Sequence, residues 1–396
     1  MNKEDFNFTH AADRSTSRVI NQKALVELID RSDGISKTEL ANELGLSKSA
    51  VSRNLADLIS FGIVEEKGEA EADRNGGRKP VMLCINKSHR YIGVLDISLE
   101  EPACAIGDLS YNILKIQNVS ISRESSAENK KRHVAQIFKE MLQQLSIPPE
   151  KLGVIVISQP CAIGPDNKMF FIPTYYDKWT DIGIVDYLVQ EFQVPVILKN
   201  DLQLASIGEM NLGLGKSLQS LIYVSCGIGL GSGIIINGKL YEGRYNQVDG
   251  EIGVFLHSDG RQMEDVVAME GLLKRIFQIY EENGQKVENL TFDEVVEKSK
   301  AGDPLVNQGI AEIGRILGQL IHNCSIFLDI PTIIFGGLYL KLGVPLFDSM
   351  KECIAHLNLP IQIEILPSSL KEEPCIFGGL VVGKDEILSE ELRKLN

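Results

Sequence analysis

Residues 36–59, SKTELANELGLSKSAVSRNLADLI, constrain the fold of this chain more than any other stretch. Ser36 followed by Glu39 is a capping box, in which the Ser hydroxyl accepts from a free amide and the Glu side chain reaches back. Gly45 can end the first helix in the left-handed conformation, and Ser47 can cap a second helix. The segment therefore predicts two short helices joined by a tight turn.

The second of these helices has an apolar face and a polar face. Val51, Leu55 and Leu58 recur at helical spacing and are expected in the core, which leaves polar side chains of the first two turns outside. A DNA recognition helix presents such side chains to base edges and phosphates. We therefore predict contacts to double-stranded DNA from Ser36, Lys37, Ser47, Lys48, Ser49, Ser52, Arg53 and Asn54.

Flanking segments complete a winged helix-turn-helix. Apolar residues within 19–29 predict a preceding helix, and Ile63–Glu66 and Val81–Ile85 predict two strands. The polar tip between the strands ends in RNGGRKP, which suits phosphates or the minor groove. The alternative is a small three-helix bundle that binds nothing. From the wing we expect DNA contacts by Gly77, Arg78 and Lys79.

The net charge of −14 is unevenly distributed. Residues 1–90 hold 14 Lys and Arg and 14 Asp and Glu, so the whole acidic excess lies in the rest of the chain. An acidic body repels DNA, and we therefore expect DNA contact to be confined to the N-terminal domain.

Cysteine spacing and hydropathy exclude several classes. The seven cysteines are widely scattered, without a CxxC pair or a Cys/His cluster, which argues against a zinc site and a disulfide framework. The chain has no signal peptide, no long apolar run and no lipidation motif. These features predict a soluble, cytoplasmic protein without a membrane partner.

After the wing the chain reads as an α/β protein. Tyr91–Asp96 and Leu152–Ile157 are apolar runs typical of buried strands. Strands come first as hairpins and later alternate with helices, including a helix at Thr180–Phe192 and a strand at Ile361–Ile365. The pattern restarts near Leu221 with a strand, a Gly-rich turn and a strand, which predicts two similar lobes with a cleft between them.

Four regions are therefore expected along the chain. They are a flexible N-terminus at 1–15, the winged helix-turn-helix DNA-binding domain at 16–88, a first lobe at 89–200, and a second lobe at 201–396 whose C-terminal helix returns to the first.

Several motifs carry a family resemblance. They are GGRKPVML after the head, LKNDLQLASIGEMNLG, GIGLGSGIIINGKLYEG, DGEIG and the late IIFGG. On these motifs nearly the whole chain resembles the ROK family (repressor, open reading frame, kinase), especially its sugar-responsive repressors of xylose or N-acetylglucosamine genes. The resemblance implies a two-lobed, actin-like sugar-kinase fold of the ROK type. In the repressors, this body binds a sugar or another protein and controls the attached DNA-binding head.

The resemblance also implies a sugar site. Asn200-Asp201 matches the Asn-Asp pair of the family, whose Asp takes the proton from the sugar hydroxyl in the kinases. Glu251 in GEIG matches a sugar-contacting Glu, and Glu264 matches another. Taken singly, each Glu reads as a surface charge and Asn-Asp as an exposed turn. Together the four residues form a set of acceptors for a polyhydroxy ligand.

One phosphate-binding segment departs from the family pattern. Family kinases begin this fold with Asp-Ile-Gly-Gly-Thr, whose glycines let backbone amides approach ATP phosphates. Here the segment is Asp96-Ile97-Ser98-Leu99-Glu100, which lacks both glycines and adds a carboxylate. A second Gly-rich hairpin remains at 227–233, where it can also be a simple tight turn. We therefore expect no kinase activity and assign no catalytic residue.

The metal site of the family is altered as well. ROK proteins normally have His directly after GEIG and then a CxCGxxGC loop, which together hold a structural zinc. Here the His position is Val254, the cysteine loop is deleted, and His257 would lie on the opposite face of a regular strand. We expect no zinc and no other cofactor. The sugar contact of the missing His is also lost.

Three functions compete on this sequence. The favoured one is a DNA-binding repressor of sugar-utilisation genes whose body senses a sugar or derivative. The others are a sugar kinase that uses ATP, and a regulator whose body has stopped binding sugar and answers to a protein partner. We expect a homodimer or higher homo-oligomer on palindromic operator DNA. A small-molecule sugar that closes the cleft would then change the relative position of two heads.

Overall fold

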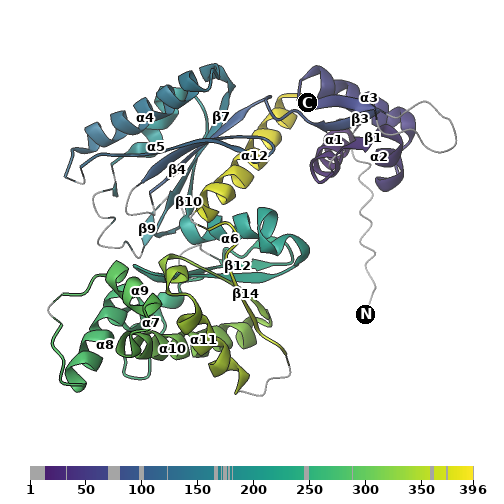
Figure 1. The fold of residues 1–396 in the computed structure, drawn as a ribbon. Helices are drawn as coiled ribbons and strands as arrows, with labels where there is room; N and C mark the ends of the chain where they lie inside the picture. The colour runs from purple at the N-terminus through teal and green to yellow at the C-terminus, as the bar shows by residue number, and fades with distance from the viewer. Residues whose placement is uncertain are drawn as a thin grey trace, which may run out of the picture.

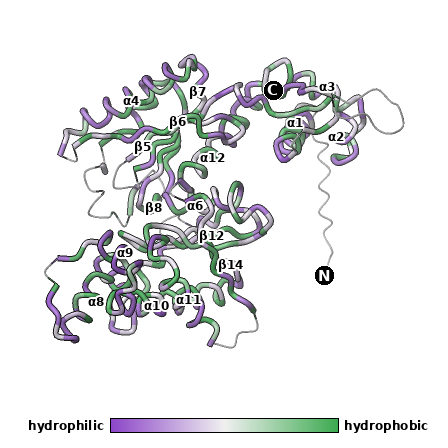
Figure 2. Tube along the Cα trace, in the orientation of Figure 1, coloured by the Kyte–Doolittle hydropathy of each residue, from purple (hydrophilic) through white to green (hydrophobic). Residues whose placement is uncertain are grey.

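The chain folds into a small head and a larger body of two lobes (Figure 1). The computed structural model describes residues 14–32, 34–69, 81–97, 102–122, 124–164, 168–170, 172, 176, 179–180, 182–244, 249–287, 289–356, 361–371 and 373–395. Figure 2 shows apolar residues concentrated in the sheets of both lobes. Within the described ranges, no helix is both long and apolar enough to cross a membrane.

The head combines three helices with a small antiparallel sheet. Its elements are α1 (Arg14–Asp30), β1 (Ile35–Ser36), α2 (Lys37–Glu43), α3 (Lys48–Ser60), β2 (Val64–Glu69) and β3 (Val81–Ile85). The strand order is β1-β3-β2, and β1 pairs with β3 through Ile35 and Leu83. The sequence did not predict β1. Leu25, Leu55 and Leu58 are fully buried where the three helices meet.

The first lobe is built on a mixed sheet. Its strands are β4 (Tyr91–Asp96), β5 (Ala103–Asp108), β6 (Ile113–Asn118), β7 (Leu152–Gln159) and β10 (Val196–Asn200), in the order β10-β7-β4-β5-β6. The helices α4 (Ala127–Gln144) and α5 (Ile184–Phe192) cover one face. A short turn η1 (Pro149–Lys151) precedes β7, and a small hairpin of β8 (Ala162–Ile163) and β9 (Met169–Phe170) follows it.

The second lobe repeats this plan. Its strands are β11 (Leu221–Cys226), β12 (Leu230–Ile236), β13 (Lys239–Leu240), β14 (Thr332–Gly336) and β15 (Glu364–Pro367), in the order β13-β12-β11-β14-β15. The outer helices are α7 (Met263–Val267), α8 (Met269–Glu282), α9 (Phe292–Lys300), α10 (Pro304–Leu328) and α11 (Val344–Ala355). The remaining short turns are η4 (Leu214–Ser217), η5 (Ile252–Val254) and η6 (Leu338–Leu342).

Two helices pack against each other between the sheets. The helix α6 (Asp201–Leu212) lies on β11 and β12 of the second lobe, and α12 (Pro374–Leu395) lies on β4 and β7 of the first lobe (Figure 1). The carboxyl end of α12 lies beside the head. The packing of α6 against α12 therefore joins the two lobes, and α12 also reaches the head.

Two expected elements begin several residues later in the structure. The helix expected at Thr180–Phe192 begins only at Ile184, because Gly183 takes the left-handed conformation with φ +67°. The strand expected at Ile361–Ile365 lies later, at Glu364–Pro367, where its parallel pairing with β14 sets the register.

Candidate DNA-binding head and interlobe ligand site

The start of α2 is fixed by the predicted capping box. The Glu39 amide donates to Ser36 Oγ over 3.2 Å, and the Ser36 amide donates to Glu39 Oε2 over 2.8 Å. Both bonds satisfy amides that lack a partner inside the helix. The Ser36 side chain is buried in this position. Ser36 is therefore a helix cap that presents no free hydroxyl to DNA, contrary to the expectation from sequence.

The outer face of α3 is polar and exposed. Ser47 caps the helix by accepting from the Ala50 amide over 3.2 Å. At 100° per residue, the next four polar positions fall within an arc of about 140° on the helix surface. Lys37 on α2 is also exposed and pairs with Glu66 over 3.3 Å. The exposed side chains on this arc are Lys48, Ser49, Ser52 and Arg53.

Asn54 does not belong to this face. Its side chain is 7% exposed, and its Nδ2 donates to the Ala50 carbonyl over 2.9 Å. Asn54 follows Val51 by three residues and precedes Leu58 by four, so it shares their buried stripe. The prediction that Asn54 contacts DNA is therefore wrong, because helical spacing turns it inward.

The tip of the wing lies outside the described residues. The structure describes β2 up to Glu69 and β3 from Val81, and these strands pair antiparallel. Three predicted contacts fall on the segment between them: Gly77, Arg78 and Lys79.

Asn200 ends β10 and caps α6 where the two lobes meet. Its Oδ1 accepts from the amides of Leu202 and Gln203 at 2.9 and 3.0 Å. Its Nδ2 donates to the Cys161 carbonyl at 3.3 Å. The Asn200 side chain therefore fixes the first turn of α6, and with it the position of Asp201.

Asp201 is the first residue of α6 and lies near Asp96, the last residue of β4. The Leu202 amide donates to Asp201 Oδ1 over 2.8 Å. Burial, followed by repulsion from Asp96, raises the pKa of Asp201 to about 8. At neutral pH this carboxyl therefore keeps its proton and can donate as well as accept. Sugar hydroxyls offer the same two roles.

Glu251 follows the turn at Gly250 on the second lobe. Burial raises the pKa of Glu251 to about 7, and repulsion from Glu264 and Asp249 adds to the effect. Repulsion from Glu251 in turn contributes to the raised pKa of Asp201. The structure therefore places these carboxyl groups within electrostatic reach of one another.

Glu264 on α7 supports the Gly-rich turn of the second lobe. Its Oε2 accepts from the Leu230 amide over 2.8 Å. A Cβ atom at Gly229 would lie 2.9 Å from the same oxygen, so the missing side chain makes room for the carboxylate. This contact explains the glycine without a bound phosphate. The carboxylate that the sequence assigns to a sugar site thus already has one backbone partner.

Three further residues complete the site and were missed from sequence. Asp96 is buried at the carboxyl end of β4, a position that could have marked it, since cleft residues belong at such strand ends. Gln203 Nε2 donates to Asp249 Oδ2 over 2.9 Å and ties α6 to the loop of Glu251. No local pattern links Gln203 to Asp249, because the packing of the lobes brings them together.

The altered phosphate segment is described only in part, whereas the altered metal segment lies wholly within the described residues. Asp96 and Ile97 are described, whereas 98–101 are not. The segment Ile252–Val254 forms a 3-10 turn. The expectation that His257 lies on the opposite face of a regular strand from Val254 therefore does not hold. His257 Nδ1 lies 3.1 Å from Asp259 Oδ1. In the part of the chain that the structure describes, no group of three or more His, Cys, Asp or Glu side chains is placed to hold a metal ion.

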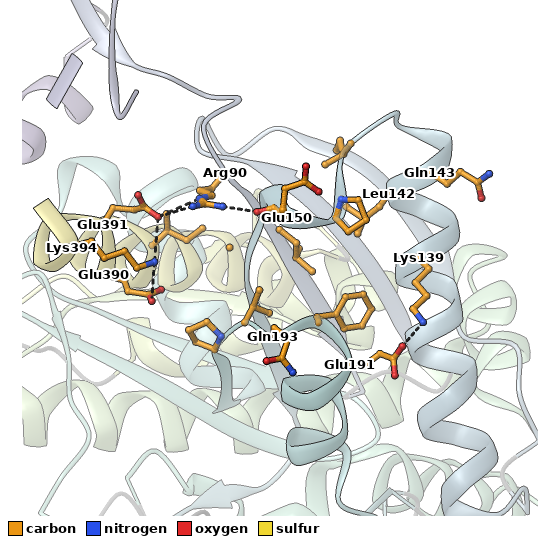
Figure 3. A pocket seen from close by; sticks show the side chains of 18 residues that line it. Arg90, Lys139, Leu142, Gln143, Glu150, Glu191, Gln193, Glu390, Glu391 and Lys394 are labelled. Atoms are coloured by element: carbon orange, nitrogen blue, oxygen red, sulfur yellow. Dashed lines mark hydrogen bonds and ion pairs between the residues drawn. The ribbon is translucent and has the colours of Figure 1, made fainter. Parts of the chain in front are cut away.

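A separate cavity of about 750 Å³ lies on the first lobe (Figure 3). It opens at the starts of β4 and β7, whereas Asn200 stands at the carboxyl end of the parallel strand β10. Charged side chains at its rim form ion pairs with each other: Lys139 pairs with Glu191, and Arg90 pairs with Glu391. None of the predicted sugar-site residues lines it, so the cavity is distinct from the interlobe site.

Comparison with known proteins agrees with this architecture. The MarR family model matches residues 19–78, and the ROK family model matches residues 91–386. The xylose repressors of Staphylococcus xylosus and Bacillus subtilis (strain 168) are each 26% identical to the chain. These alignments cover 91% and 95% of this chain, and 94% and 98% of the two relatives. The DNA-binding transcriptional dual regulator NagC of Escherichia coli (strain K12) is 21% identical over 86% of this chain and 88% of NagC.

Solved structures show the same fold. A ROK family transcriptional regulator, described as a homologue of the E. coli MLC protein, has a TM-score of 0.79 at 20% identity and covers 95% of this chain and 99% of its own. A ROK family glucokinase from Streptomyces griseus, in complex with glucose and AMPPNP, has a TM-score of 0.60 at 18% identity and covers 74% and 99%. The predicted fold, a winged helix-turn-helix followed by a two-lobed actin-like sugar-kinase body, is thereby confirmed. Because the family model spans well over half of its residues, the chain belongs to the ROK family.

Proposed function

We propose that this protein is a DNA-binding transcriptional repressor of sugar-utilisation genes, whose kinase-like body binds a sugar or sugar derivative and thereby controls operator binding. One observation carries the proposal: an exposed polar helix face stands on a head joined to a ROK body with clustered carboxyl groups between its lobes. Relatives named as repressors align with nearly the full chain, which supports the same role.

The DNA-contacting residues of this proposal come from α2, α3 and the wing. Lys48, Ser49, Ser52 and Arg53 lie on the exposed arc of α3, where a recognition helix faces the major groove. Ser36 and Asn54 are omitted because their side chains are buried. We propose that a homodimer or higher homo-oligomer places two such helices on a palindromic operator. The remaining proposed contacts are Lys37, Ser47, Gly77, Arg78 and Lys79.

The proposed ligand is a neutral polyhydroxy molecule, and xylose is the first candidate because several relatives are named xylose repressors. Asp201, Glu251 and Glu264 would accept hydroxyl donors, and protonated Asp201 would also donate. A sugar phosphate is disfavoured, because its charge would enter a site lined by carboxyl groups. Asn200 contributes by holding Asp201 in place.

We further propose that the protein is not a sugar kinase and holds no zinc. Leu99 and Glu100 occupy positions where family kinases need glycine and threonine beside ATP phosphate. A coupled ADP-release assay with D-xylose, D-glucose and N-acetylglucosamine should show no turnover above background. Sugar-dependent ADP release above background would overturn this assignment. Elemental analysis of the purified protein should find no stoichiometric zinc, and one zinc ion per chain would overturn the inference from the deleted cysteine loop.

The decisive experiment selects bound duplexes from a random DNA library and measures the enriched sequence by fluorescence anisotropy. We expect a palindromic sequence whose affinity changes at least severalfold with one of the three sugars. Asp201→Ala should bind the same duplex without responding to sugar. If no duplex is enriched, the protein is not a DNA-binding regulator. If a duplex is enriched but no sugar changes its affinity, a regulator that answers to a protein partner is favoured.

A further inference from the structure

An ion pair between a buried lysine and a partly exposed aspartate joins the head to the body. Lys384 on α12 is 1% exposed, and its ammonium contacts Oδ1 of Asp30, the last residue of α1. The same ammonium lies 4.1 Å from the ring centre of Tyr111, whose hydroxyl donates to Asp30 Oδ2 over 3.4 Å. A charge removed from water to this degree needs a partner. Lys384 and Tyr111 therefore both hold the end of α1 against the first lobe.

The surroundings of Lys384 are built to hold it in place. Tyr111 lies in the turn between β5 and β6, and Asp108 at the start of this turn accepts from the amides of Ser110 and Asn112 at 2.8 and 3.0 Å. Asp108 and Asp385 add negative potential around the ammonium. A rigid turn and a helix thus present one site to the head.

A second contact of α12 reaches the neck, the segment 86–90 between β3 and β4. Glu391 Oε2 lies 3.3 Å from His89 Nε2. Glu391 Oε1 accepts from Arg90 Nε at 3.3 Å (Figure 3). The Glu391 side chain is buried. The carboxyl-terminal half of α12 therefore contacts the head at α1 and at the neck, and a movement of this helix would reach both points.

The other end of α12 lies at the interlobe site. Cys375 Sγ donates to the carbonyl of Asp201 over 3.4 Å. A Cβ at Gly378 would lie 1.8 Å from the Leu204 carbonyl oxygen, and a Cβ at Gly208 would lie 2.5 Å from the Pro374 carbonyl oxygen. At these glycines α6 and α12 touch backbone to backbone. Such close packing leaves little room for one helix to slide past the other.

The distance along α12 is short. Lys384 follows Cys375 by nine residues, which corresponds to about 14 Å of helix at 1.5 Å per residue. A rigid rod of this length transmits a displacement at one end to the other. Asp201, which we place in the ligand site, is thus linked to the head through two helices and one ion pair.

We propose that α12 carries the state of the interlobe site to the DNA-binding head, and that the Lys384–Asp30 pair is the contact that sets the orientation of the head. The coupling part of this proposal rests on the proposed sugar-binding function. Ligand contacts to Asp201 would move α6, and α12 would follow because of the glycine contacts. The head would then either keep its pairing with Lys384 or lose it, which gives two discrete orientations.

The first test needs no ligand. The head–body distance is measured between two spin labels, one at exposed Ser60 of the head and one at exposed Gln136 of the first lobe. The full-length protein is used, with half-buried Cys84 and Cys353 changed to Ser. We expect one narrow distance distribution, which Lys384→Met broadens or shifts. The matched control is Lys139→Met, since Lys139 also pairs with an acidic side chain in the first lobe but does not touch the head. Lys139→Met should leave the distribution unchanged.

A second variant protects the test against misfolding. Asp30→Asn removes the negative charge on the head and leaves Lys384 in place. Cooperative thermal melting of this variant would show that it is folded. In the folded variant, the head–body distance distribution should broaden or shift as it does in Lys384→Met. A distribution that stays narrow and unshifted in both variants would overturn the proposal.

The second test adds D-xylose, D-glucose or N-acetylglucosamine at millimolar concentration. A sugar that raises the melting temperature should also shift the head–body distance in the wild type. In Lys384→Met the same sugar should still raise the melting temperature but no longer shift the distance; an equal distance shift in both proteins would overturn the coupling. If none of the sugars raises the melting temperature, sugar sensing as the proposed function fails, while the ligand-free test still decides the role of Lys384.

Discussion

Gln203 Nε2 lies 2.9 Å from Asp249 Oδ2, and this hydrogen bond joins the segments that carry Asp201 and Glu251. Gln203 is buried, so its loss removes the side-chain donor of half-buried Asp249 and an interior hydrogen bond between the two segments. We expect Gln203→Met to lower the free energy of unfolding by about 1–3 kcal/mol, measured by urea denaturation. Gln136→Met is the control, since the exposed bond from Gln136 to Glu140 should contribute almost nothing. Equal losses in the two variants would contradict the buried role of Gln203.

Removing the helix cap at Asn200 should affect both the stability of the protein and its response to sugar. Asn200→Ala removes the acceptor of two α6 amides and should lower the free energy of unfolding by about 1 kcal/mol. Ser126→Ala removes the cap of α4, remote from the site, and should have a similar effect on stability. Only Asn200→Ala should reduce the rise in melting temperature caused by an active sugar, because it also releases Asp201. A sugar effect that is the same in both variants would show that the cap does not position Asp201.

The raised pKa of Asp201 predicts the pH dependence of stability. Its pKa is about 8 in the folded protein and near 3.8 ordinarily, so between these values the folded state binds more protons than the unfolded state. Stability must therefore fall as pH rises through this range, and Glu251, with a pKa of about 7, acts in the same direction. Asp201→Asn should show a smaller drop in urea midpoint between about pH 5 and pH 8 than the wild type. An unchanged drop would mean that Asp201 ionises normally.

Two neighbouring residues on α3 should behave oppositely on DNA. Arg53→Ala should weaken binding to the selected duplex and reduce the salt slope by about one if a phosphate contact is lost. Asn54→Ala should instead destabilise the fold by about 1 kcal/mol, because it removes a bond to Ala50 and leaves a small void. Its affinity for DNA should stay close to that of the wild type. Anisotropy titrations at several salt concentrations distinguish the two cases.

The local sequence pattern predicted those elements whose position is set by their own apolar or capping residues. Strand β4 has the predicted bounds, and the capping box at Ser36 forms as the spacing indicates. The same reasoning failed for β15, since its register depends on pairing with β14 and not on its own residues. It failed for Asn54 because a polar residue on an inward stripe looks like a surface residue until the helix phase is applied strictly.

The interlobe site was only partly predictable for a related reason. Asn200 and Asp201 stand together in the sequence and at a strand end, so their position could be inferred. Asp249 and Gln203 meet only because the lobes fold against each other, and the link from Lys384 to Asp30 spans almost the whole chain. Such contacts leave no periodic trace in the sequence.

The position of α12 has a consequence for synthesis of the protein. Ile92, Val94 and Val154 form an apolar sheet face that Leu380 and Ile387 cover, but α12 is made only after the entire second lobe. At ribosomal rates of about 5–20 residues per second, that face waits uncovered for an interval on the order of tens of seconds. The first lobe therefore cannot complete its core until residues 374–395 emerge, and we expect chaperones that shield apolar surface to bind the nascent chain during that interval.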